Sequence, residues 1–110
     1  MINWLQNWFD AQCDSDWEHG NGIRIETIDN PGWNIEIDLN GTHLELIQKE
    51  WQLLEISNDN WVGYKIENNL YSASGDPQKL ELLILIFKQI VENKIVANSY
   101  IFDNMQNSRN

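Results

Sequence analysis

Hydrophobic and polar residues alternate with a period of two along residues 23–27 and again along residues 33–39. Alternation of this kind is typical of β-strands with one buried face. Asn40 and Gly41 then supply the two positive-φ residues that a type I′ turn requires, and the apolar alternation resumes over residues 42–46. The pattern therefore predicts a tight hairpin between strands at 33–39 and 42–46.

The register of this hairpin follows from the length of its turn. A two-residue turn places Glu36 opposite Glu45 on the polar face, and pairing Thr27 with Trp33 places Arg24 beside Glu36. Two carboxylates at opposing positions destabilise a sheet unless a cation or a binding partner offsets them. The polar face of the hairpin is therefore a candidate binding surface.

Further elements are predicted on both sides of this hairpin. Short apolar runs that follow turns rich in Asn and Asp predict three more strands, at residues 52–57, 61–67 and 70–74. Aromatic and apolar residues at helical spacing predict an amphipathic helix over residues 2–12. Asp76 and Pro77 predict the N-cap and the first position of a longer helix that reaches residue 91.

Together these elements predict an α+β fold that forms a single domain over residues 1–110. The expected core is an antiparallel β-meander of about five or six strands, packed with the N-terminal helix and the longer C-terminal helix. Leu82, Leu85 and Ile86 lie on or near the polar stripe of the longer helix, so that helix must be covered from more than one side. The first helix, the tail or another copy of the chain could provide this cover. Residues 95–110 have weak periodicity and predict no particular element.

The length and the charge of the chain narrow the class of protein. A chain of 110 residues, 42% of them hydrophobic, is long enough for one domain with a buried core. Seven basic and seventeen acidic side chains give a net charge of −10, which argues against binding to nucleic acid or to anionic membranes. The whole excess lies in residues 1–60, which hold two basic and twelve acidic side chains.

The cysteine content and the apolar runs indicate the cellular compartment. Cys13 is the only cysteine and cannot form an internal disulfide, whereas small secreted domains usually contain several disulfides. No signal-peptide hydrophobic region opens the sequence, and no apolar run is long enough to span a membrane. We therefore expect a cytoplasmic protein.

Cys13 is also the one candidate nucleophile. Its acidic neighbours Asp14, Asp16 and Glu18 favour the neutral thiol over the reactive thiolate. A sulfur carrier would in addition need backbone donors and an arginine around the sulfur, and no such loop follows Cys13. We therefore predict no catalytic residue, and a small cysteine-dependent enzyme such as a sulfur carrier stays as an alternative.

The sequence contains little that would hold a metal or a cofactor. His19, His43 and Cys13 lack the paired spacings that preorganise a metal site. The acidic segment 14–18 has neither the turn glycine nor the closing glutamate of a calcium loop in the required positions. Neither a phosphate loop nor a dinucleotide fingerprint occurs. We expect no metal and no cofactor.

Tryptophan is abundant, with six residues in the chain. Trp17 lies in a polar loop over residues 13–22, between Asp16 and Glu18. Tryptophan is enriched at the energetic centres of protein interfaces, so an exposed Trp17 would make an anchor with an acidic rim. The alternative is that Trp17 is buried and anchors the loop to the core.

Several motifs in the first half of the chain occur together at a characteristic spacing. Trp4-Leu5, Trp8-Phe9 and Trp17-Glu18-His19 are followed by Asp29-Asn30-Pro31-Gly32-Trp33 and Ile37-Asp38-Leu39. In this combination the chain resembles the immunity protein 53 family of bacterial polymorphic toxin systems. The resemblance is dense over residues 3–46 and looser to about residue 92, and Ser15 stands where the family pattern has glycine. It implies a small cytoplasmic protein that binds and neutralises a cognate toxin and is not an enzyme.

The resemblance does not say which residues contact the toxin, but the distribution of charge suggests them. An acidic inhibitor is steered rapidly onto a basic toxin and can cover a site that binds phosphates. We therefore predict a toxin-binding surface formed by Asp14, Asp16, Trp17, Glu18, Glu36, Asp38 and Glu45. A second alternative is an adaptor that self-associates through the Leu82, Leu85 and Ile86 side of the longer helix.

Overall fold

Alternating apolar positions form the five strands of one antiparallel sheet in the computed structural model, which describes residues 1–107. The strands are β1 (Ile23–Ile28), β2 (Gly32–Asp38), β3 (Lys49–Ser57), β4 (Asn60–Glu67) and β5 (Leu70–Gly75). The predicted α+β fold with an antiparallel sheet is confirmed. The predicted domain also includes residues 108–110, which lie outside the described part of the chain.

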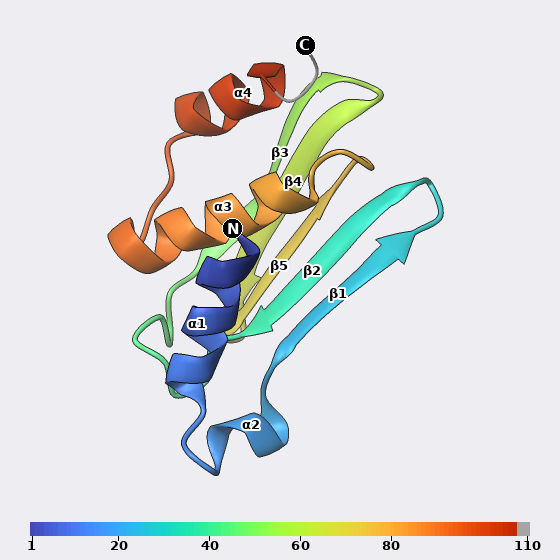
Figure 1. Cartoon of the computed structure of the whole chain (residues 1–110). Helices are drawn as coiled ribbons and strands as arrows, with labels where there is room; N and C mark the ends of the chain where they lie inside the picture. Colours follow the sequence, from blue (N-terminus) through green and yellow to red (C-terminus); the bar gives the residue numbers. More distant parts are fainter. Residues whose placement is uncertain (108–110) are drawn as a thin grey trace.

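The strands are ordered β1-β2-β5-β4-β3 across the sheet (Figure 1). β1 and β2 form one hairpin, while β3, β4 and β5 form a meander whose last strand pairs with β2. The predicted register of the first hairpin is confirmed, because Thr27 lies opposite Trp33 and Arg24 lies opposite Glu36. The order departs from a simple meander at one point, where β5 lies between β2 and β4.

The predicted strand at residues 42–46 is wrong. These residues form turns. A type I′ turn requires a positive φ at both Asn40 and Gly41, and of these two only Gly41 has one, at 72°. The Thr42 hydroxyl donates to the Leu39 carbonyl at 2.8 Å and accepts from the Leu44 N–H at 3.1 Å. Leu39, Thr42 and Leu44 are buried, whereas Leu46, the last apolar position that the pattern assigned to the strand, is 79% exposed.

The helices are α1 (Ile2–Gln12), the single turn α2 (Trp17–Gly20), α3 (Leu80–Asn93) and α4 (Asn98–Asn107). Three of them, α1, α3 and α4, lie on one side of the sheet, and the short α2 lies beyond the end of the strands (Figure 1). The predicted first helix has the bounds that the pattern gave, and α4 is an element that the sequence did not predict. Within residues 1–107, no helix is long and apolar enough to cross a membrane.

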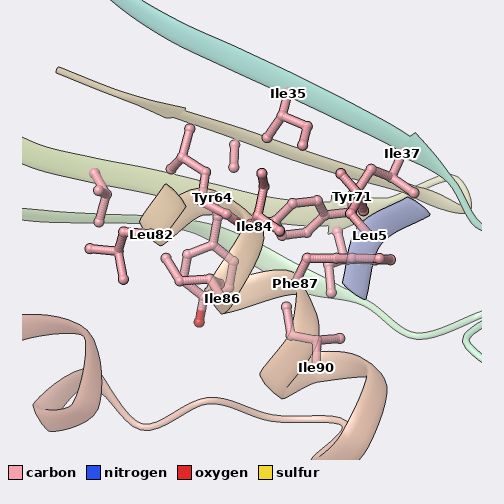
Figure 2. Close-up of a cluster of buried hydrophobic side chains, with 14 of the residues drawn as sticks. Leu5, Ile35, Ile37, Tyr64, Tyr71, Leu82, Ile84, Ile86, Phe87 and Ile90 are labelled. Atoms are coloured by element: carbon pink, nitrogen blue, oxygen red, sulfur yellow. The ribbon is translucent and has the colours of Figure 1, made fainter. Parts of the chain in front are cut away.

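The core lies between α1, α3 and the covered face of the sheet (Figure 2). Phe87 of α3 contacts Trp8 of α1 edge to face, with ring centroids 4.9 Å apart, and Tyr71 of β5, at 5.1 Å. The buried Tyr71 hydroxyl donates a hydrogen bond to the Leu83 carbonyl at 2.7 Å. Aromatic packing and one satisfied polar group therefore join the sheet to both helices.

The longer helix begins at Leu80 rather than at Pro77, so the predicted capping role of Asp76 is wrong. Asp76 instead forms a buried ion pair with Lys79, in which Oδ2 lies 2.8 Å from Nζ and both side chains are at most 1% exposed. The Asp76 carboxylate also accepts hydrogen bonds from the N–H groups of Trp61 and Gln78, both at 2.9 Å. Asp76 thus joins the start of β4 to the connection between β5 and α3.

The chain itself covers the second apolar side of α3. Leu82 and Ile86 are buried, and α4 packs against α3 and β3 through the buried Ile101 and Met105. Leu85 is half-buried. The C-terminal tail, as α4, therefore covers this side of α3, which is one of the possibilities that the sequence left open. The apolar side of α3 that suggested self-association is largely buried within the chain.

Candidate functional site

The predicted toxin-binding residues lie toward one end of the molecule, in three places. These are the segment around α2, the polar side of β2, and the turns that follow β2 (Figure 1). The Gly22 N–H donates to Asp38 Oδ2 at 2.9 Å, and the Trp17 indole Nε1 donates to the Asn40 carbonyl at 2.7 Å. These two bonds attach the α2 segment to β2 and to the turns after it.

Two of the predicted carboxylates fix the backbone that precedes α2. Asp14 Oδ1 accepts hydrogen bonds from the N–H groups of Asp16, at 3.0 Å, and Trp17, at 2.8 Å. Glu18 Oε1 accepts from the Asp14 N–H at 3.0 Å, which makes the arrangement reciprocal, as in a capping box. Ser15 has a φ of 77°, the left-handed conformation that glycine adopts most readily.

The same hydrogen bonds favour the charged forms of both carboxyl groups. Donation from the Trp17 and Asp16 N–H groups lowers the pKa of Asp14. Backbone N–H groups, its own first, lower the pKa of Glu18 despite some desolvation. Asp14 and Asp16 are exposed and lie among the residues that line an open hollow, together with His19 and Gly41. This segment therefore presents anionic groups on a backbone held in one conformation.

Trp17 is buried beneath this segment, with 8% of its surface exposed. Its ring makes edge contacts with Trp8 and Phe9 of α1, at centroid distances of 6.2 and 6.0 Å. Of the two roles considered for Trp17, the structure supports the anchor that joins the loop to the core. Asp14 and Asp16 are exposed, whereas the Trp17 ring is buried.

Glu36 and Asp38 share a cation on the uncovered face of the sheet. Arg24 Nε lies 3.2 Å from Glu36 Oε1, and Arg24 Nη1 lies 3.0 Å from Asp38 Oδ2. Hydrogen bonds to these carboxylates, that to Asp38 first, raise the pKa of Arg24. The predicted pairing of Glu36 with Glu45 is wrong, because residues 42–46 are not a strand and Glu45 Oε2 accepts from the Gly41 N–H at 2.7 Å. The repulsion that first suggested a binding face is therefore absent.

Cys13 follows α1 and is half-buried. Its Sγ donates to the Phe9 carbonyl at 3.4 Å. Desolvation, followed by the charges of Glu18, Asp10 and Asp14, raises the pKa of the Cys13 thiol. Because the thiolate is the reactive form, this environment opposes nucleophilic chemistry. Within residues 1–107, no three His, Cys, Asp or Glu side chains are placed to hold a metal ion.

We expect Cys13 to react slowly with a thiol reagent. At pH 7.5, labelling by a disulfide reagent such as DTNB should be several-fold slower in the folded chain than in urea, because folding raises the thiol pKa. The measurement is the labelling rate of the wild-type chain with and without denaturant. Faster labelling of the folded chain would contradict this prediction and support the cysteine-dependent alternative.

The sequence analysis did not predict that apolar residues lie exposed on the face of the sheet that carries no helix. Trp51 is 50% exposed and Leu53 is 49% exposed, both on β3. A β-bulge between Lys49 and Gln52 shifts the register next to Trp51. The spacing of Trp51 and Leu53, two residues apart, was an available signal that they share a face, but it did not say which face.

The turn between β1 and β2 serves the fold. A Cβ on Gly32 would collide with the Gly75 carbonyl oxygen, so the close approach of β2 to β5 requires glycine there. The indole Nε1 of Trp33 donates to the Pro77 carbonyl at 3.0 Å, and the Asn30-Pro31 peptide bond is cis. Gly32 and Trp33 thus join the first hairpin to the end of β5, while Asp29, Asn30 and Pro31 are exposed.

A small α+β chain with an anionic end on a fixed backbone, and with its cysteine held as a thiol, has the features of a binding protein. The chain matches the family described as Immunity protein 53 over residues 2–92 and belongs to that family. Immunity proteins neutralise toxins, so the family implies a toxin as the partner. The matched residues end within α3, and α4 follows them. No curated protein and no solved structure is similar enough to the chain to count as a match.

Proposed function

We propose that this immunity protein neutralises its cognate toxin by stoichiometric binding through an acidic surface, in the cytoplasm of the cell that makes both proteins. The family membership supports toxin neutralisation, and the charge supports the kind of surface. Residues 1–48, which supply the acidic end, contain nine Asp and Glu residues and only one Lys or Arg, Arg24. That imbalance favours a toxin domain with a basic binding surface.

The observation that carries the proposal is the way in which the acidic groups are held. Asp14 and Glu18 are fixed by backbone hydrogen bonds, and Asp16 lies exposed between them. Glu45 is fixed on the neighbouring turn by the Gly41 N–H. Charges that keep their positions when the partner arrives lose little conformational entropy on binding. Such a surface increases the association rate through long-range attraction and opposes a basic site without rearranging.

Asp16 provides the sharpest test, because its exposed side chain has no structural task comparable to those of Asp14 and Glu18. Asp16→Lys should slow association with the toxin domain encoded beside this chain by roughly threefold to tenfold at low ionic strength. The difference should shrink in high salt, because salt screens exposed charges. The measurement is the association rate of purified proteins over a range of salt concentrations.

Glu81→Lys is the matched control, since Glu81 is an exposed residue of α3 and the substitution changes the net charge equally. Co-expression of the wild-type chain with the active toxin comes first and should rescue growth with a 1:1 complex. Rescue with equal effects of Asp16→Lys and Glu81→Lys would keep the function and remove the acidic surface from it. Failure of the wild-type chain to rescue growth or to form a complex would contradict the function itself.

A further inference from the structure

One whole face of the sheet carries no helix (Figure 1). Side chains alternate between the faces of a strand, so the register decides which residues lie there. Leu53 pairs with Gly63, Gly63 with Ser74, and Ser74 with Asn34, which gives one row across four strands. The Ser74 hydroxyl donates to Asn34 Oδ1 at 2.8 Å, which confirms that both side chains share this face. We call it the open face.

An apolar group occupies the β3–β4 side of the open face. Trp51 and Leu53 are about half exposed. The Trp51 ring lies over Gly63, where a Cβ would collide with it. Trp61, half-buried, lies two residues before Gly63 and therefore on the same face. We call Trp51, Leu53 and Trp61 the aromatic corner. Single exposed apolar residues are ordinary, but a group rimmed by polar residues is typical of interaction sites.

The charge of the open face indicates the kind of partner that it would bind. Outside the register shift of β3, the pairing and alternation place on the open face the carboxylates Glu26, Glu36, Asp38, Glu55 and Glu67 and the cations Arg24 and Lys65. Both cations are already paired, Arg24 with Glu36 and Asp38, and Lys65 with Glu67 at 3.2 Å. Glu55 and Glu67 lie on the strands of the aromatic corner, and the other three carboxylates lie on β1 and β2 at the opposite edge of the sheet. The face is therefore acidic overall with an apolar group at one side, and it complements a partner with a basic surface and an apolar cavity.

We propose that the aromatic corner is the apolar anchor of the toxin interface and that the toxin lies across the open face toward the acidic end. This inference rests on the proposed function. Tryptophan side chains at the centre of an interface often supply much of the binding energy, while charges around them control the association rate. A second copy of the chain is the weaker occupant, since two acidic open faces would repel each other.

The size of the face supports a shared interface. Five strands spaced about 4.8 Å apart, each contributing about seven residues at 3.4 Å, provide on the order of 500 Å² of flat surface. A stable complex usually buries about 800 Å² on each partner. The open face is thus of the order of size that an interface requires, and the acidic end around α2, attached to the same sheet through Asp38, can extend it.

Trp51→Ala and Leu53→Ala test the inference with two separate variants. Each should raise the Kd for the purified neighbouring toxin domain by at least tenfold, mainly through faster dissociation, as expected for truncated anchors. Ile95→Ala is the matched control, because Ile95 is 76% exposed and lies outside the open face. It should change the Kd less than twofold. Thermal unfolding of each variant shows that the fold is retained.

Wild-type Kd values for both Trp51→Ala and Leu53→Ala, with wild-type rescue intact, would overturn the aromatic corner while leaving the immunity function in place. A concentration-dependent dimer of the wild-type chain that Trp51→Ala abolishes in sedimentation would assign the corner to self-association instead. Absence of any complex between the wild-type chain and the active toxin would overturn the function and this inference together.

Discussion

Replacing Asp76 with alanine should lower the free energy of unfolding by about 3–5 kcal/mol, because it leaves a charged Lys79 buried without its partner. The Lys79 side chain is fully buried and the Asp76 side chain is 1% exposed, and Nζ lies 2.8 Å from Oδ2. Asp76 also accepts the N–H groups of Trp61 and Gln78. The measurement is urea unfolding at pH 7, and a loss below about 1 kcal/mol would contradict the prediction.

Two variants separate the charge from the geometry. Asp76→Asn can keep some of the hydrogen bonds and should cost less than Asp76→Ala. The double variant Asp76→Ala, Lys79→Met removes both charges and should recover much of the loss, since a buried pair is often replaced by apolar groups at little cost. Asp103→Ala is the control, because Asp103 is an exposed carboxylate of α4 and should change stability by less than about 0.5 kcal/mol.

The pH dependence gives a second readout of this pair. Burial raises the pKa of Asp76, but hydrogen bonds from Lys79, Gln78 and Trp61 outweigh burial and hold it below its usual value. A carboxyl group with a lowered folded-state pKa stabilises the fold above its unfolded value, about 3.9, and loses this contribution as the pH falls through the folded value. The wild-type chain should therefore lose more stability below pH 4 than the double variant does.

The first hairpin was predictable from sequence because its pattern fixes both the strands and the register. A slip of one residue would turn Ile35 and Ile37, now fully buried, toward the open face. The same pattern does not identify the strand on the other side of β2. Residues 42–46 alternate equally well, yet β5 pairs with β2 over six residue pairs. Local periodicity cannot distinguish a strand from turns that bury Leu44 and leave Leu46 exposed.

The sequence predicts which charged residues belong to the candidate site, but it predicts their contacts less well. Arg24 lies beside Glu36 because the β1–β2 register requires it. The contact of Glu45 with the Gly41 N–H depends on the turn conformation of residues 42–46, which the local pattern wrongly predicted as a strand. The open face depends on where the helices pack, which is a tertiary property. Trp51 lies beside a bulge, and bulges leave little trace in a sequence. The α4 helix was not predicted because its helical pattern is weak. It is stabilised by tertiary packing against α3, which local sequence does not show.

Trp17→Ala should lower the free energy of unfolding by about 3–5 kcal/mol, the usual cost of deleting a large buried aromatic side chain. The substitution removes the contacts with Trp8 and Phe9 and the hydrogen bond to the Asn40 carbonyl. These contacts attach α2 to α1 and to the turns after β2. Urea unfolding measures the loss, and a nearly unchanged stability would show that the α2 segment is not anchored by this ring.

Trp17→Phe distinguishes an anchor from a toxin contact. Phenylalanine keeps most of the packing and loses only the indole hydrogen bond, which is worth about 0.5–1.5 kcal/mol. If Trp17 acts from beneath by holding Asp14 and Asp16 in place, toxin affinity should follow stability, with Trp17→Ala weak and Trp17→Phe close to wild type. A Trp17→Phe chain that is stable but loses toxin affinity would mean that the ring contacts the toxin, which requires the α2 segment to open on binding.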